Sequence, residues 1–183
     1  MPDPTLRLAL LYGSDRRQRF CDTIAAWAVA HAEAMGGWSI DRLDPATPEG
    51  RDGAALERKV READAFLVVT PEYNHGYPAA LKAMIDAVYI PWQAKPVAFI
   101  SYGGLSRGLC AVEQLRQVFA SLHAVPLRDG VSFAHARDQF AADGTLPGGH
   151  PAHKAMRLAL WRLRWWAGAL RQARLLIPYD AAA

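Results

Sequence analysis

Short apolar runs of strand-forming residues recur along this chain, and they alternate with segments of helical periodicity. Residues 6–12, 65–70 and 96–102 are such runs, and apolar side chains dominate them without a regular polar alternation. A strand of this kind is buried on both faces, which is typical of a parallel sheet covered by helices on both sides. The pattern therefore predicts an α/β fold before any motif is considered.

The other elements follow from hydrophobic spacing and from turn residues. Residues 20–31 have helical spacing that stops at Gly36 and Gly37, and residues 38–43 form a weaker strand candidate. Further helices are expected over residues 54–62, 79–89, 109–123 and 151–174, and short strands over 125–127 and 131–134. The 183 residues suit one domain, and we expect it to span residues 1–183 with five parallel strand regions.

Composition and charge argue against several classes of protein. Hydrophobic residues make up 51% of the chain, yet no apolar run approaches the ~18 residues of a membrane span. No basic segment followed by an apolar stretch stands at the N-terminus, so no secretory signal is expected. The net charge of +3 comes without a long basic tract, so we expect neither nucleic acid nor membrane as a partner. Cys21 and Cys110 have neither metal nor redox spacing, and we expect reduced thiols in a cytoplasmic protein.

A parallel sheet binds ligands at the carboxyl ends of its strands, near a switch in strand order. The loop after the first strand contains Gly13, Ser14, Arg16 and Arg19 and leads into a helix, whose N-terminus favours a phosphate. The loop lacks the glycine patterns of ATP-type and dinucleotide cradles, which leaves a single terminal phosphate, as on a mononucleotide. The alternative is a solvated basic turn that caps the helix.

The loop after the third strand, residues 71–77, combines rigid and permissive residues. Pro71 ends the strand, Tyr73 and Tyr77 offer flat faces to an aromatic ring, and Asn74 and Gly76 tolerate unusual backbone angles. Backbone N–H groups of this loop can therefore reach the edge of a planar heterocycle. The same loop carries His75, for which a local or solvent-facing position is favoured over a catalytic role. After the fourth strand, residues 101–108 hold three glycines, which also allow close approach to a ligand.

The three loops taken in order carry a resemblance. Gly13-Ser14-x-Arg16, residues 71–76 (Pro-Glu-Tyr-Asn-His-Gly) and residues 101–104 (Ser-Tyr-Gly-Gly) resemble the NADPH-dependent FMN reductase family, which is related to quinone and chromate reductases. Residues 95–99 and 111–116 belong to the same pattern, so the similarity covers most of the chain. It implies a flavodoxin-like three-layer fold, with a five-stranded parallel sheet in the order 2-1-3-4-5 and helices on both faces.

The resemblance also implies which residues bind the cofactor. The FMN phosphate would be held by the first loop and the start of the first helix: Ser14, Arg16, Arg19, Phe20 and Cys21. The isoalloxazine ring would be lined, mostly through backbone, by Pro71, Glu72, Tyr73, Asn74 and His75. Its other edge would be flanked by Ser101, Tyr102, Gly103 and Gly104. Arg107 and Cys110 stand where relatives often have Gly and Arg.

The implied function is an FMN-dependent oxidoreductase. It would pass hydride from NADPH or NADH through FMN to a small acceptor such as a flavin or a quinone. Such chemistry needs no acid or base from the protein, so we expect no catalytic side chain, and the pair His150 and His153 has too few ligands for a metal site. Two alternatives are a flavodoxin-type electron carrier, which is usually acidic, and a flavin-sensing binding protein.

The last predicted helix carries two apolar stripes on nearly opposite sides. One stripe contains Met156, Leu160, Leu163, Ala167 and Leu170, and the other contains Leu158, Trp161, Trp165 and Ala169. A helix on a sheet needs one buried stripe, so the second predicts another burial surface. We expect a homodimer or homotetramer, and the alternative is that residues 175–179 fold back over the tryptophans.

Overall fold

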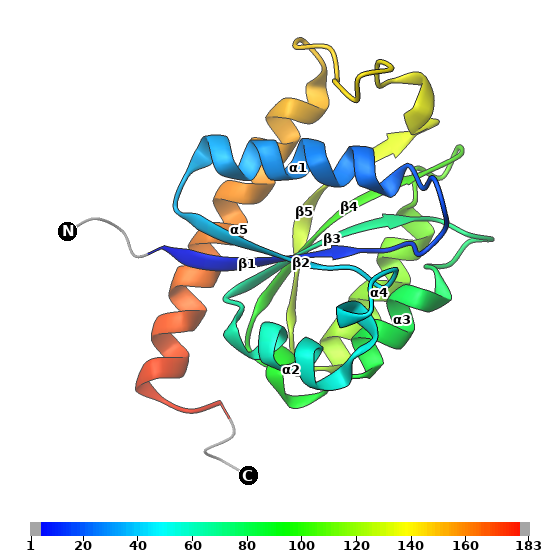
Figure 1. Cartoon of the computed structure of the whole chain (residues 1–183). Coiled ribbons are helices and arrows are strands. Elements are labelled where there is room, and N and C mark those ends of the chain that lie inside the picture. The colour runs from blue at the N-terminus through cyan, green and yellow to red at the C-terminus, as the bar shows by residue number, and fades with distance from the viewer. Residues whose placement is uncertain (1–4, 180–183) are drawn as a thin grey trace.

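A parallel sheet of five strands forms the centre of the computed structural model, which describes residues 5–179. The strands are β1 (Leu6–Tyr12), β2 (Trp38–Leu43), β3 (Ala65–Pro71), β4 (Pro96–Gly103) and β5 (Val125–Ala134). Their order is β2-β1-β3-β4-β5, and every neighbouring pair is parallel (Figure 1). The expected fold class and strand order are therefore confirmed.

Helices cover both faces of this sheet. They are α1 (Cys21–Met35), α2 (Gly53–Glu62), α3 (Ala79–Asp86), α4 (Leu109–Ser121) and α5 (Pro151–Leu176), with 3₁₀ turns η1 (Glu49–Arg51), η2 (Ile90–Trp92) and η3 (Ala136–Asp138). α1 and α5 lie on one face, and α2, α3 and α4 lie on the other (Figure 1). Alternate residues of each strand point to opposite faces, so Leu8 and Leu10 of β1 join the first core and Ala9 and Leu11 join the second.

The structure differs from expectation at β5 and at α3. The two short strand candidates form one strand, because its pairing with β4 shifts register between Val97 and Phe99 and the chain continues past the interruption. Gly130 lies in the shifted part, where a Cβ atom would stand 2.6 Å from the Phe99 carbonyl oxygen. α3 ends at Asp86 rather than at Tyr89, and η2 with Pro91 follows it.

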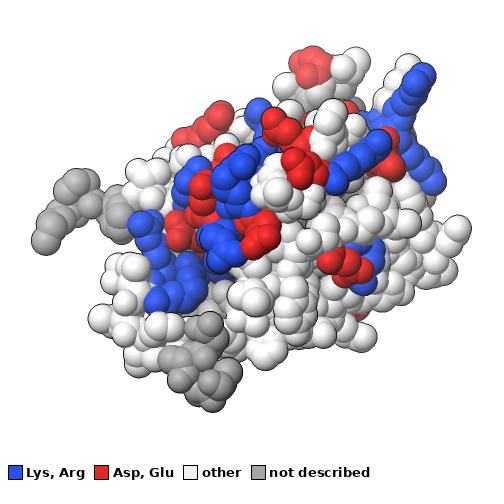
Figure 2. Space-filling model, turned by 60° about the horizontal axis from the view of Figure 1, so that its bottom comes forward, with Lys and Arg blue, Asp and Glu red and all other residues white. Residues whose placement is uncertain are grey.

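Charged side chains close the amino-terminal edge of the sheet. Asp64 accepts a hydrogen bond from the Arg7 backbone N–H and pairs with Arg171 and Arg174 of α5. Lys95 is buried nearby and donates to the carbonyl oxygens of residues 60 and 61. On the face drawn in Figure 2, most Lys and Arg side chains lie next to Asp or Glu. Within residues 5–179, no helix is both long and apolar enough to cross a membrane.

Candidate functional site

A cleft opens at the opposite, carboxyl-terminal edge of the sheet. Its volume is about 350 Å³, within the range of small-molecule sites, and its lining residues are Phe20, Pro71, Glu72, Tyr73, Tyr102, Gly103, His135, Ala136, Arg137 and Asp138. These residues end or follow β3, β4 and β5, and Phe20 directly precedes α1. The strand order reverses between β1 and β3, so the cleft lies where an open α/β sheet binds ligands.

The loop between β1 and α1 presents a row of unpaired N–H groups. Gly13 lies so close to β3 that a Cβ atom would stand 2.7 Å from the Thr70 Cα atom, and its N–H donates to the Val69 carbonyl oxygen. Beyond it, the backbone N–H groups of residues 14, 15, 17, 18 and 19 donate no hydrogen bond to any described residue. Next to the N-terminus of α1, this arrangement suits an anion.

Side chains of this loop fall into two groups. The buried Ser14 hydroxyl shares a hydrogen bond of 2.9 Å with the Tyr73 hydroxyl, and the Arg16 guanidinium lies 3.7 Å from the Tyr73 ring centroid. Arg19 instead points to Asp44, which it contacts through both terminal nitrogens, and to Asp22. Ser14 and Arg16 therefore lie beside the cleft residue Tyr73, whereas Arg19 is engaged by two carboxylates.

A tight turn follows β3. Tyr73 and Gly76 exchange two backbone hydrogen bonds, and the residues between them, Asn74 and His75, have φ angles of 49° and 64°. Positive φ at both central positions is the signature of a type I′ hairpin turn. The N–H groups of Asn74 and His75 have no partner among the described residues, whereas the Gly76 N–H is used within the turn.

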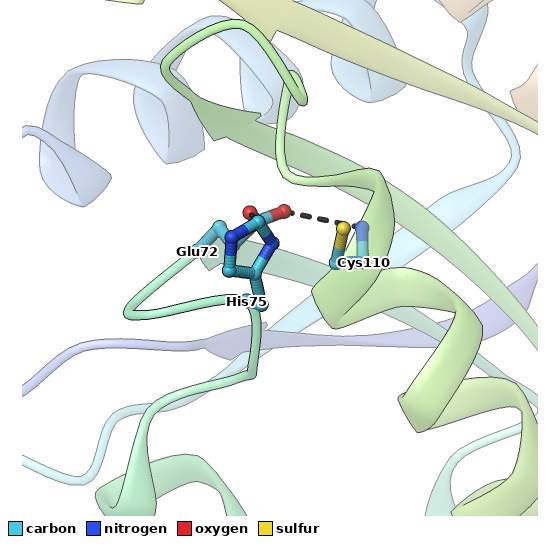
Figure 3. A group of neighbouring side chains, drawn as sticks. All are labelled: Glu72, His75 and Cys110. Carbon is cyan, nitrogen blue, oxygen red and sulfur yellow. Dashed lines mark hydrogen bonds and ion pairs between the residues drawn. The ribbon is translucent and has the colours of Figure 1, made fainter.

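Glu72 ties this turn to the loop after β4. Its backbone N–H donates to the Tyr102 carbonyl oxygen, and its carboxylate accepts from the Ser106 hydroxyl at 2.7 Å and from the Cys110 N–H at 3.1 Å. The Cys110 N–H belongs to the first turn of α4, so the carboxylate caps that helix (Figure 3). Glu72 thus fixes the relative position of two walls of the cleft.

The loop after β4 is held from within. The Ser101 hydroxyl donates to the Arg107 carbonyl oxygen at 2.9 Å. Gly108 has a φ of 81°, and a Cβ atom there would stand 2.7 Å from the Tyr102 nitrogen. Burial raises the pKa of the Tyr102 hydroxyl, and it raises the pKa of the neighbouring Cys21 thiol to about 11. Cys21 donates to the Val69 carbonyl oxygen, so its side chain is inert and faces the sheet.

The structure brings six of the expected site residues into the cleft: Phe20, Pro71, Glu72, Tyr73, Tyr102 and Gly103. Ser14 and Arg16 contact the cleft residue Tyr73, and Asn74 and His75 directly follow it in the chain. Gly104 is exposed. The side chains of Arg19, Cys21 and Ser101 have partners within the fold. The fourth wall, residues 135–138, was missed, although the end of β5 must share the edge where the other parallel strands end.

Comparison with known proteins identifies the family. The model of the family described as NADPH-dependent FMN reductase matches residues 6–138. The chain belongs to this family. It is 34% identical over 142 residues to an NAD(P)H-dependent FMN reductase of Schizosaccharomyces pombe, and the aligned region covers 67% of this chain and 70% of that protein. It is 33% identical over 140 residues to an NADPH:quinone oxidoreductase of Arabidopsis thaliana, covering 67% and 71%.

Solved structures support the same fold. FerB, a flavoenzyme NAD(P)H:(acceptor) oxidoreductase from Paracoccus denitrificans, superimposes with a TM-score of 0.69 at 20% identity, covering 91% of this chain and 98% of FerB. The flavodoxin of Megasphaera elsdenii gives a TM-score of 0.52 at 14% identity, covering 85% and 98%. This member of the FMN reductase family therefore has a flavodoxin-like fold.

Proposed function

We propose that this chain is a single FMN-binding domain over residues 1–183 that transfers electrons from NADPH or NADH to a small acceptor. The observation that carries the proposal is that two sets of backbone N–H groups without a partner among residues 5–179 lie beside one cleft at the switch point of the sheet. One set belongs to residues 14, 15, 17, 18 and 19, and the other to Asn74 and His75. One set suits a phosphate and the other suits the polar edge of a flat ring.

The phosphate end of FMN belongs to the loop after β1. The N–H groups of residues 14–19, the Ser14 hydroxyl and the Arg16 guanidinium supply donors for it. Arg19 remains a predicted phosphate ligand, but its pairing with Asp44 supports a role in holding the loop. Phe20 and Cys21 contribute through the first turn of α1.

The ring end belongs to the other loops. Pro71, Tyr73, Tyr102 and Gly103 line the cleft and would shield the ring from water, and the N–H groups of Asn74 and His75 would hydrogen-bond to the ring edge. Bound FMN supplies the redox chemistry, by accepting hydride from NAD(P)H and passing electrons to the acceptor. The chain binds and orients, and we assign no side chain as acid or base. His75 is 84% exposed, consistent with the solvent-facing role expected for it.

The names of the relatives favour an enzyme over an electron carrier or a flavin sensor. They include FMN reductases, NADPH:quinone oxidoreductases and a 2-hydroxy-1,4-benzoquinone reductase of a Burkholderia species. We therefore propose a flavin or quinone as acceptor. Arg107 is exposed in the loop between β4 and α4 and is proposed to pair with a phosphate of the nicotinamide nucleotide, so Arg107→Ala should raise KM for NADPH.

The binding step is tested by comparing FMN with riboflavin, which lacks the phosphate. Flavin fluorescence titrations should show FMN binding at least roughly 10-fold tighter, because hydrogen bonds to a charged group contribute about 1.5–3 kcal/mol each. Arg16→Ala should weaken the binding of FMN but not that of riboflavin. Arg58 is an exposed arginine on α2, and Arg58→Ala should change the affinity for neither flavin. Equal affinity of the wild type for both flavins would contradict the proposed phosphate loop.

We also propose a homodimer or homotetramer formed through α5. Met156, Leu160 and Leu163 are buried against the sheet, while Trp161 and Trp165 are 61% and 58% exposed. The described tail does not cover the tryptophans, since Leu175, Leu176 and Ile177 are exposed as well. Light scattering after size exclusion at micromolar concentration should give at least twice the mass of one chain, and a monomeric mass would contradict the proposal.

The cytoplasm is the proposed location. Cys21 and Cys110 are free thiols rather than a disulfide, which suits a reducing compartment.

A further inference from the structure

Three side chains of different donor type converge at the rim of the cleft. Glu72 and His75 come from the turn after β3, and Cys110 comes from the first turn of α4 (Figure 3). A carboxylate oxygen, an imidazole nitrogen and a sulfur atom, one from each, lie within 4.8 Å of one another. The His75 Nδ1 and Glu72 Oε1 atoms are 3.8 Å apart.

The Glu72 side chain places a carboxylate in a largely buried position. The side chain is only 7% exposed, and within residues 5–179 no Lys or Arg pairs with it. A hydroxyl, an N–H group and the N-terminus of α4 offset part of the charge. Because buried charges in proteins are paired or coordinate metals, the remaining charge calls for a cation.

We propose that Glu72, His75 and Cys110 form a binding site for a divalent transition metal of the zinc type. Zinc takes carboxylate, imidazole and thiolate ligands together, whereas magnesium and calcium prefer oxygen ligands. A carboxylate, a thiolate and a neutral imidazole carry two negative charges, which one divalent ion balances. As the metal–sulfur bond forms, the thiol proton leaves to solvent.

The geometry requires a small closure only. Tetrahedral zinc with bonds of about 2.0–2.3 Å places its ligand atoms about 3.3–3.8 Å apart. The Glu72 carboxylate is already oriented by Ser106 and by the Cys110 N–H, and the exposed His75 ring is free to turn toward the sulfur. Three protein ligands leave a fourth position for water or a small ligand, and because Glu72 also lines the cleft, the metal would link the turn to α4 at its rim.

Cobalt(II) is the probe, since a thiolate ligand gives it a sulfur-to-metal charge-transfer absorption. The full chain, freed of metal by chelation and used without flavin, should bind one Co²⁺ with this absorption, and Zn²⁺ should displace it. Cys110→Ser should abolish the absorption. His75→Ala removes a ligand, so it should weaken Co²⁺ binding at least as much as Ser106→Ala does. Ser106→Ala keeps all three ligands but removes the hydroxyl that orients Glu72, so it should weaken binding roughly 10–100-fold.

Matched controls come from the other histidines. His123→Ala removes an imidazole at the amino-terminal edge, and His153→Ala removes one ring of the His31–His153 pair, whose nitrogens lie 2.9 Å apart. Both variants should keep the sulfur absorption. Melting temperatures without metal establish that each variant is folded. Co²⁺ binding without the sulfur absorption, or with an absorption that survives Cys110→Ser, would overturn the proposal. An affinity for Co²⁺ that His75→Ala leaves unchanged would overturn it as well.

Discussion

The Arg19–Asp44 ion pair connects the loop of residues 14–19 to the loop after β2. Removing the pair therefore tests what holds the loop of residues 14–19 in place. The Arg19 side chain is 9% exposed and that of Asp44 is 18% exposed. Arg19 also donates to the Ser14 carbonyl oxygen and to Asp22. Arg19→Ala therefore leaves the Asp44 carboxylate largely buried without its cation and releases the backbone at Ser14.

The expected cost follows from this burial. Removing one partner of a buried ion pair costs about 3–5 kcal/mol, and partial exposure of Asp44 reduces the expectation to about 2–3 kcal/mol. In a domain of this size, that loss lowers the melting temperature by roughly 4–12 °C. Burial alone would raise the pKa of Asp44, but hydrogen bonds from Arg19 and from the Ala46 N–H outweigh it, so the pKa lies below its ordinary value of 3.8.

The sign of the pH dependence follows from the lowered pKa. The stabilisation is fully present above the pKa of Asp44 in the unfolded chain and is lost as the pH falls through the folded-state pKa. The stability difference between wild type and Asp44→Asn should therefore shrink below about pH 4. Urea unfolding of Arg19→Ala, Asp44→Ala and the double variant at pH 7 measures the coupling of the pair.

A surface pair provides the control. Lys82 and Asp86 on α3 form an exposed ion pair, and Lys82→Ala should cost no more than about 0.5 kcal/mol. A destabilisation by Arg19→Ala no larger than that of this control, or a coupling energy between Arg19 and Asp44 below about 0.5 kcal/mol, would contradict the expected role of the pair.

Three further predictions concern buried groups. Burial lowers the pKa of Lys95 to about 7 from 10.5 in the unfolded chain. Between pH 7 and 10.5 the unfolded chain therefore binds more protons, and the free energy of unfolding should rise with pH by up to about 1.4 kcal/mol per pH unit. Lys95→Met should remove that slope in urea titrations at about pH 7.5 and 9. Gly13→Ala places a Cβ atom 2.7 Å from the Thr70 Cα atom, so it should displace the loop after β1 and weaken FMN binding in the fluorescence titration more than riboflavin binding; equal weakening would contradict this. Cys110 is half-buried and Cys21 fully buried with its pKa near 11, so a thiol reagent should modify one cysteine rapidly in the native protein, and two rapid thiols would contradict the structure.

The sequence was most informative about the fold where burial is symmetrical. The apolar runs of β1, β3 and β4 identify strands covered on both faces. β1 ends where its run ends, and β3 and β4 each extend one residue further. The strand order came from the family resemblance rather than from periodicity. β5 appeared as two pieces because residues 128–130 interrupt the apolar pattern, and only the pairing with β4 shows that the strand continues through a shift in register.

The site was predicted as three loops, and the remainder depends on contacts between distant residues. Arg19 and Asp44 stand 25 positions apart, so no local pattern reveals that the arginine is engaged there rather than with a ligand. Glu72 and Cys110 are 38 positions apart. Glu72 was expected to contribute mostly through its backbone, whereas its carboxylate accepts a hydrogen bond from the Cys110 N–H. Residues 135–138 carry no motif, and their place at the cleft follows from the parallel sheet alone.

Anaerobic reduction of bound FMN distinguishes a flavin-dependent reductase from an electron carrier and from a flavin-sensing protein. The protein is loaded with FMN, freed of excess flavin, and mixed with NADPH or NADH while the flavin absorbance is recorded. We expect a yellow protein that bleaches on addition of the nucleotide and regains its colour when a quinone is added. A yellow protein that neither nucleotide bleaches would indicate an electron carrier or a flavin-sensing protein, and a chain that retains no FMN would contradict the assignment of the cleft itself.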